Sequence, residues 1–279
     1  MVRLKLQLKL FSREILLFTA TLLLGLFSAY RILGSKSVTI LPGEFNITDF
    51  IVLGIFIAVL VLARNKRRFI SFFYRCFLIL IIFTGSQLIF GAFFVSPFDL
   101  MLSLIFLTIF FVYKNVLIHN IGIILGIAGV SAAVGLSITP KVGVILLIVL
   151  SFYDIISVYK TKHMIHMAKS MIQSGAIFGF IVPPSLGSFL TNKGEAQDQV
   201  GQQFMILGSG DIGLPLIMVC SLVRLSLGVA LITGFFSLIG LFFTHLIFVN
   251  QTKRSPMAAL PPIATMTIIG YVIAQSIIL

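Results

Sequence analysis

Long runs of apolar residues, separated by shorter polar stretches, dominate the sequence. A helix of about 20 residues crosses roughly 30 Å of hydrocarbon, and a window of that width finds nine candidate membrane helices. They cover residues 14–33, 48–63, 70–95, 98–113, 117–137, 141–160, 202–223, 225–248 and 258–278. The pattern predicts an all-α membrane protein, with residues 1–279 forming a single membrane domain.

One connection is much longer than the others and divides the chain into a six-helix part, 1–160, and a three-helix part, 202–279. This loop, residues 161–201, opens with KTKHMIHMAKSMIQ, in which apolar residues alternate with Lys and His as in an interfacial amphipathic helix. The next segment, AIFGFIVPPSLGSF, is too short and too interrupted by proline to cross a bilayer. The polar segment TNKGEAQDQVGQQ that follows is expected to be mobile.

Basic residues concentrate on one side of the predicted helices. The N-terminus and the even-numbered loops hold Arg3, Lys5, Lys9, Arg13, Arg64, Lys66, Arg67, Arg68, Lys114, Lys160, Lys162, Lys169, Lys193, Lys253 and Arg254. The odd-numbered loops hold only Arg31, Lys36, Lys141 and Arg224. Since Lys and Arg near helix ends stay on the cytoplasmic side, the N-terminus is predicted to be cytoplasmic and the C-terminus to lie outside.

Composition places the chain outside the soluble class. Hydrophobic residues make up 59% and charged residues 10%, and the mean hydropathy is +1.15. The net charge of +12 lies mostly at helix ends, where anionic lipid headgroups attract it. Nucleic-acid binding is not expected, because the basic residues are not interleaved with exposed aromatic residues. We expect an integral multi-pass protein of the cell membrane that contacts lipid.

Two acidic residues lie inside strongly apolar segments: Asp154 in SFYDIISVY and Asp211 in LGSGDIGLP. An ionisable carboxyl in hydrocarbon is costly, so each is a candidate functional residue. Asp154 lies about six residues from the cytoplasmic end of its predicted helix and Asp211 about nine, which places both on the order of 10 Å deep from the same side. The two carboxyls can therefore meet.

Paired carboxyls in a low-dielectric site cannot both ionise, so the pair shares a proton. Aspartic proteases use this arrangement: the ionised member takes a proton from water, and the protonated member polarises the peptide carbonyl. Gly208 and Gly210 leave space beside Asp211 for water and a substrate backbone. The same glycines also fit a helix-packing role of the small-xxx-small type.

Other chemistries fit the residues less well. The histidines are His119, His163, His166 and His245, and none lies in a His-Glu-x-x-His motif, so neither a metal nor another cofactor is expected. A serine protease in which His245 activates Ser209 would leave the two aspartates unexplained. The main rival is a transporter or channel that uses Asp154 and Asp211 as a proton or cation relay, although no inverted repeat is visible. An inactive helix-binding scaffold is a further alternative.

Three motifs resemble the Tyr-Asp, Gly-x-Gly-Asp and Pro-Ala-Leu signatures of the presenilin and signal peptide peptidase family. The matching residues are Tyr153 and Asp154, then Gly208, Ser209, Gly210 and Asp211, and then Ala258, Ala259, Leu260 and Pro261. The resemblance covers essentially the whole chain. It implies an intramembrane aspartyl protease in which Asp154 and Asp211 are catalytic and the other motif residues support the site. Ala258 departs from the family pattern, which has proline there.

The resemblance also implies partners. The substrates would be transmembrane-helix proteins, cleaved within the membrane after the helix unwinds. Our own hypothesis is that the mobile segment before the seventh helix pairs with the unwound substrate as an added strand. The predicted topology matches that of presenilins, which implies substrates with an outside N-terminus. The compact length resembles archaeal members more than animal presenilins, so accessory subunits are not expected to be required. A homo-oligomer remains open.

Overall fold

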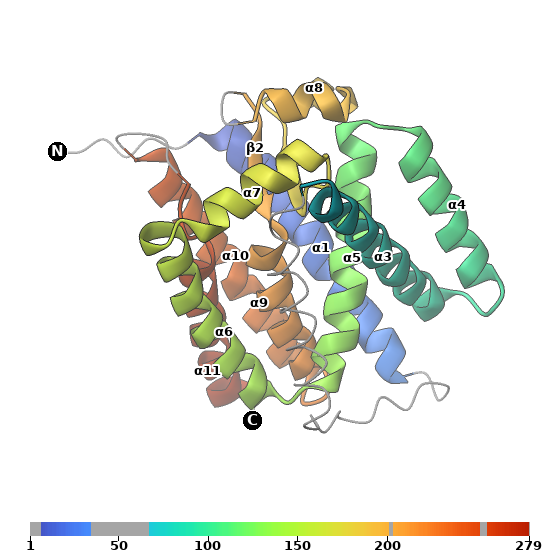
Figure 1. Ribbon diagram of the computed structural model, residues 1–279. Coiled ribbons are helices and arrows are strands. Elements are labelled where there is room, and N and C mark those ends of the chain that lie inside the picture. The colour runs from blue at the N-terminus through green and yellow to red at the C-terminus, as the bar shows by residue number, and fades with distance from the viewer. Residues whose placement is uncertain (1–6, 35–66, 201–202, 252–255, 279) are drawn as a thin grey trace.

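The computed structural model describes residues 7–34, 67–200, 203–251 and 256–278. Within these ranges the chain is mostly helical (Figure 1). The α-helices are α1 (Leu8–Gly34), α3 (Arg67–Phe93), α4 (Phe98–Val112), α5 (Val116–Ser137), α6 (Pro140–Ile155), α7 (His163–Ser174), α8 (Lys193–Asp198), α9 (Ser209–Leu222), α10 (Leu227–Val249) and α11 (Leu260–Ile278). A π turn, η2 (Ile156–Lys160), and a 3-10 turn, η3 (Gly187–Leu190), complete the helical elements.

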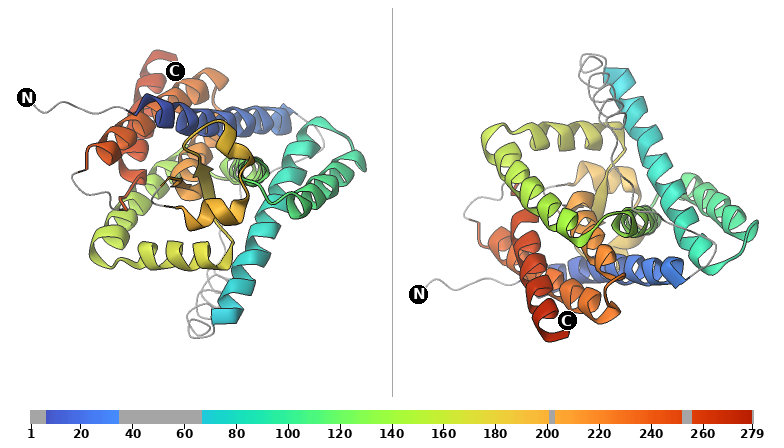
Figure 2. Two further views of the ribbon diagram at one scale, coloured as in Figure 1. Left: turned by 90° about the horizontal axis from the view of Figure 1, so that it is seen from above. Right: turned by 90° about the horizontal axis from the view of Figure 1, so that it is seen from below.

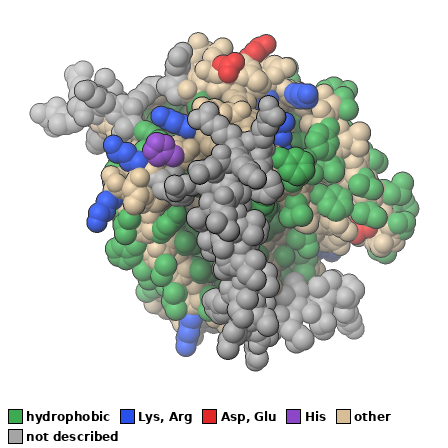
Figure 3. Space-filling view, viewed as in Figure 1, with side chains coloured by type: hydrophobic (Ala, Val, Ile, Leu, Met, Phe, Trp, Pro, Cys, Tyr) green, Lys and Arg blue, Asp and Glu red, His purple; other side chains and the backbone are tan. Residues whose placement is uncertain are grey.

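Six helical segments of the described chain are long and apolar enough to cross a membrane. They are Leu8–Gly34, Ser71–Phe93, Val116–Ser137, Pro140–Lys160, Leu227–Val249 and Leu260–Ile278. Two apolar helices, α4 and α9, are shorter. The predicted helix over 48–63 lies outside the described residues. The chain is therefore a multi-pass membrane protein, with apolar side chains over its flanks and basic ones gathered at the end where α7 and α8 lie (Figure 3).

The segment predicted as one helix over 202–223 differs in the structure. Its first part forms strand β2 (Met205–Gly208), which pairs antiparallel with β1 (Gly179–Val182), and α9 begins only at Ser209. The apolar run before Asp211 suits a buried strand as well as a helix, and pairing with a distant strand decides between them. Asp211 consequently lies in the first turn of a helix rather than about nine residues inside one.

The predicted loop is also more ordered than expected over its described part, residues 161–200. The half-buried apolar residues Met164, Ile165 and Met171 line one side of α7, while His166 and Lys169 are exposed. The apolar segment that follows provides β1, which is fully buried, and the polar stretch contains α8. Figures 1 and 2 show α7, α8 and the two strands at one end of the helix bundle.

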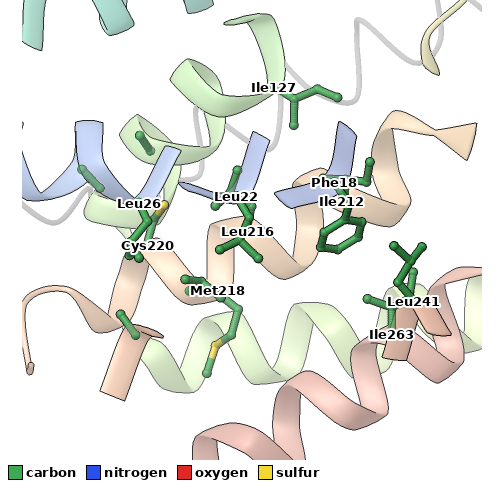
Figure 4. Close-up of a cluster of buried hydrophobic side chains, with 14 of the residues drawn as sticks. Phe18, Leu22, Leu26, Ile127, Ile212, Leu216, Met218, Cys220, Leu241 and Ile263 are labelled. Atoms are coloured by element: carbon green, nitrogen blue, oxygen red, sulfur yellow. The ribbon is translucent and has the colours of Figure 1, made fainter. Parts of the chain in front are cut away.

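Helix α1 lies along one side of the bundle (Figure 2), and its inner face packs against α5, α9 and α10. Its apolar stripe includes Phe18 and Leu22, which meet Ile212 and Leu216 of α9 in the core (Figure 4). Lipid tails are as apolar as these side chains, so close van der Waals packing between the two helices, rather than removal from water, stabilises their contact. The helix that carries Asp211 is thus held by α1 along its length.

The contact between α5 and α9 is close enough to require a glycine. A Cβ at Gly135 would lie 2.5 Å from Cβ of Cys220 and 2.6 Å from the carbonyl oxygen of Ile217. Both distances are below normal van der Waals contact, and the second neighbour is backbone that cannot rotate away. Gly135 therefore sets how closely α5 approaches α9.

We expect Gly135→Ala to destabilise the protein by about 1–3 kcal/mol, because the added methyl overpacks a backbone contact. The thermal unfolding midpoint in detergent should fall accordingly. Gly187→Ala is the matched control, because a Cβ there meets nothing within 4 Å. Equal midpoints for the two variants would contradict the close approach.

Candidate active site

Asp154 lies in the last turn of α6, directly before the π turn η2. Single π turns inside helices occur frequently at functional sites. The side chain is 6% exposed, and its Oδ2 accepts a hydrogen bond of 3.3 Å from the backbone N–H of Leu260. The start of α11 therefore contributes directly to the environment of this carboxyl.

Asp211 lies in the first turn of α9, where the positive end of the helix dipole favours an acidic side chain. Its half-buried side chain bends back to a hydrogen bond with the backbone of Gly208, the N-cap residue. A Cβ at Gly208 would lie 2.9 Å from Oδ2 of Asp211, so only glycine leaves room for this conformation.

The structure brings these two carboxyls together. α6 and α9 pack against each other, and α11 packs against both. Asp154 lies at the end of α6 that leads to α7, and Asp211 at the end of α9 that follows β2, so both carboxyls lie at the same end of the bundle (Figure 1) and are near enough to interact electrostatically. Two carboxyls that interact in an apolar bundle disfavour each other's ionised form, so a state with one proton on the pair is favoured.

The other motif residues predicted from the sequence occupy different environments. Ala258 and Leu260 are buried, 5% and 3% exposed, in the segment that leads into α11. Pro261 is half-buried, within the first turn of that helix, where a missing N–H is tolerated. A Cβ at Gly210 would meet nothing within 4 Å. Tyr153 is 51% exposed, on the outer surface of α6.

The strand pair that leads to Asp211 is fastened to α5 by polar side chains that the sequence analysis did not single out. The side-chain amide of Asn120 donates to the carbonyl of Ile181 at 2.8 Å and accepts from its N–H at 2.9 Å. His119 Nε2 lies 3.0 Å from the carbonyl oxygen of Gly179. The sequence does carry a signal for these residues, because two adjacent polar residues interrupt an otherwise apolar helix. Both side chains bond to the inner edge of β1, which is the edge that faces α5 and not β2.

The serine protease alternative finds no support. Nδ1 of His245 lies 2.9 Å from Oε2 of Glu14, deep between α10 and α1, with both side chains at most 2% exposed. The remaining ring nitrogen, Nε2, has no hydrogen-bond partner in the described chain, Ser209 included. No group of three metal-ligating side chains occurs among the described residues.

Comparisons with known proteins agree with this geometry. A family model described as signal-peptide peptidase, presenilin aspartyl protease matches residues 36–278. A solved structure of a presenilin family intramembrane aspartate protease, in a P2 crystal form, is 26% identical, with a TM-score of 0.61 over 98% of this chain and 99% of that one. A C222 crystal form gives 24% identity and a TM-score of 0.58 over 93% and 94% of the chains.

Comparison with curated proteins gave no match. Neither the family model nor the solved structures favour the transporter considered from the sequence. The family model alone covers well over half of the chain, and it includes Asp154, Asp211 and the segment that opens α11. The chain therefore belongs to the signal-peptide peptidase and presenilin family of intramembrane aspartyl proteases.

Proposed function

We propose that Asp154 and Asp211 are the catalytic pair with which this protease hydrolyses peptide bonds inside the transmembrane helices of substrate proteins. The observation that carries the proposal is that the packed helices α6, α9 and α11 place two acidic side chains at the same end of an apolar bundle, beside the start of α11. Each carboxyl also receives a backbone hydrogen bond, from Leu260 or at Gly208, which restricts its orientation.

In this mechanism the pair retains one proton. The ionised carboxyl takes a proton from water as the water oxygen attacks the peptide carbonyl, and the protonated carboxyl donates a hydrogen bond to the developing oxyanion. Collapse of the tetrahedral intermediate returns a proton to the leaving amine. Gly210 supplies open space near Asp211, and Gly208 leaves room for the Asp211 carboxyl itself. We assign Tyr153, on the outer surface of α6, to contact with the substrate.

Asp154→Asn and Asp211→Asn should each reduce cleavage of a transmembrane reporter in liposomes by about a thousandfold or more. Either change removes one of the two carboxyls that share the proton, and the mechanism needs both. Asp198→Asn, at the exposed end of α8, is the matched control. Purified chain alone should suffice, since we propose that no accessory subunit is needed. Cleavage that survives either catalytic-site change would exclude the aspartyl mechanism.

We further propose nine membrane spans, with a cytoplasmic N-terminus and an outside C-terminus, in the cell membrane. The charge distribution supports this topology. So does the alternation of the described helices, in which α8 and the α6–α7 junction lie at the same end of the bundle as the start of α1 (Figure 1). Residues 48–63 would supply the span that the described helices lack.

This topology predicts a preference for single-span substrates with an outside N-terminus. In liposomes that carry the same reporter span in both orientations, we expect the outside-N-terminus form to be cleaved roughly tenfold faster, because only it enters the site with the productive chain direction. Equal cleavage of both forms would contradict the proposed orientation.

The edge of β2 is the best candidate for binding the unwound substrate. Phe180 pairs with Leu207 through ladder hydrogen bonds, so the N–H and C=O of Ile206 point away from β1. Asn120 already occupies the opposite edge of the sheet. We therefore propose that the substrate adds as a strand to β2, which leads directly to Asp211.

Ile206→Pro tests strand addition, because it removes an outward N–H and spares the ladder with β1. We expect KM to rise by roughly tenfold, the effect of losing one backbone hydrogen bond and its alignment, with little change in the thermal midpoint. Ile206→Val, which keeps the N–H, should behave like wild type. An unchanged KM in the proline variant would argue against this edge.

A further inference from the structure

Thr244 is a buried threonine of α10 whose hydroxyl reaches beyond its own helix. It is 5% exposed, and Oγ1 contacts two carbonyl oxygens: that of Gly240 in the preceding turn at 3.0 Å, and that of Ala259 at 3.3 Å. Thr233 of α10 and Thr267 of α11, both fully buried, donate only to the carbonyl four residues earlier in their own helix. The second contact therefore distinguishes Thr244 from its neighbours.

The carbonyl of Ala259 and the N–H of Leu260 belong to the same peptide group. That N–H donates to Oδ2 of Asp154 at 3.3 Å. Because a trans peptide is planar, its N–H and C=O point in opposite directions, and a bond that orients one orients the other. Thr244 on one side and Asp154 on the other thus contact a single rigid unit. A hydrogen bond to the carbonyl also polarises the N–H and strengthens its bond to the carboxyl.

Two further contacts determine where the Thr244 hydroxyl lies. A Cβ at Gly240 would be 2.6 Å from Cα of Ile263, so the backbones of α10 and α11 touch one turn before Thr244. His245, the next residue, is bonded to Glu14 of α1, which packs against another side of α10 than α11 does. These contacts restrict rotation of α10 about its axis and keep the Thr244 hydroxyl directed towards the start of α11.

We propose that Thr244 is a positioning residue: through the Ala259–Leu260 peptide it orients the Asp154 carboxyl for catalysis. This inference rests on the proposed catalytic role of Asp154. Thr244 itself touches neither substrate nor the reacting atoms. Its contribution should therefore appear in the chemical step, and substrate binding should not change.

Thr244→Val tests the proposal, because valine keeps the branched shape of the side chain and replaces the hydroxyl with a methyl group that cannot donate a hydrogen bond. With the purified full chain in liposomes and a transmembrane reporter, we expect kcat to fall on the order of tenfold, with KM within about twofold of wild type. Thr244→Ser restores the hydroxyl and should recover most of kcat. Thr233→Val, the matched control on the same helix, should retain wild-type kcat.

The outcomes separate this inference from the proposed function. If the Asp154→Asn variant still cleaves the reporter, the proposed catalytic pair is wrong, and the positioning role of Thr244 falls with it. If Asp154→Asn is inactive but Thr244→Val has wild-type kcat, the positioning role alone is overturned. A loss in Thr244→Val that Thr244→Ser does not restore, or an equal loss in Thr233→Val, also overturns it, because the hydroxyl bond to Ala259 would then not be the cause.

Discussion

The need to pair every buried backbone N–H and C=O is the constraint on which this structure depends. A membrane helix meets it internally, but the chain leaves helical geometry beside both aspartates. β1 and β2 precede Asp211, and a non-helical segment precedes α11 next to Asp154. Side chains of neighbouring helices supply the missing partners: Asn120 for β1, and Thr244 for Ala259. The site is thus irregular backbone completed by polar side chains from regular helices.

The same constraint accounts for charges in an apolar helix. Arg13 and Glu14 lie in α1, yet both are buried. Arg13 donates through Nη1 to the carbonyl of Pro183 at 2.9 Å, just after β1, and Glu14 pairs with His245 of α10. Removing one partner of such a buried pair would leave an uncompensated polar group, which is far more costly than losing an exposed ion pair. α1 therefore joins the strand pair to the helix that carries Thr244.

Sequence patterns predicted those parts of the molecule that depend on local physics. Apolar runs of membrane length gave the long helices to within a few residues, as 225–248 did for α10. Asp154 and Asp211 were identified because an ionisable group in hydrocarbon is energetically costly and usually has a function. The apolar run before Asp211 was wrongly predicted as helix, because its strand conformation depends on β1, which is distant in the chain. Asn120 and Thr244 were missed because polar residues in apolar helices usually bond to their own turn.

Because Asn120 occupies the inner edge of β1, strand addition by a substrate would have to use the edge of β2, and this affects which proteins such an enzyme selects. A strand edge such as that of β2 offers backbone groups, and every peptide has the same backbone. Binding through backbone groups depends little on the side chains of the substrate. The choice among transmembrane helices would then depend on how easily each helix unwinds and breaks its own hydrogen bonds. Spans containing glycine or β-branched residues, which weaken a helix, would be admitted before uniformly leucine-rich ones. The stability of the substrate helix, rather than a recognised sequence, would then determine which proteins are cleaved.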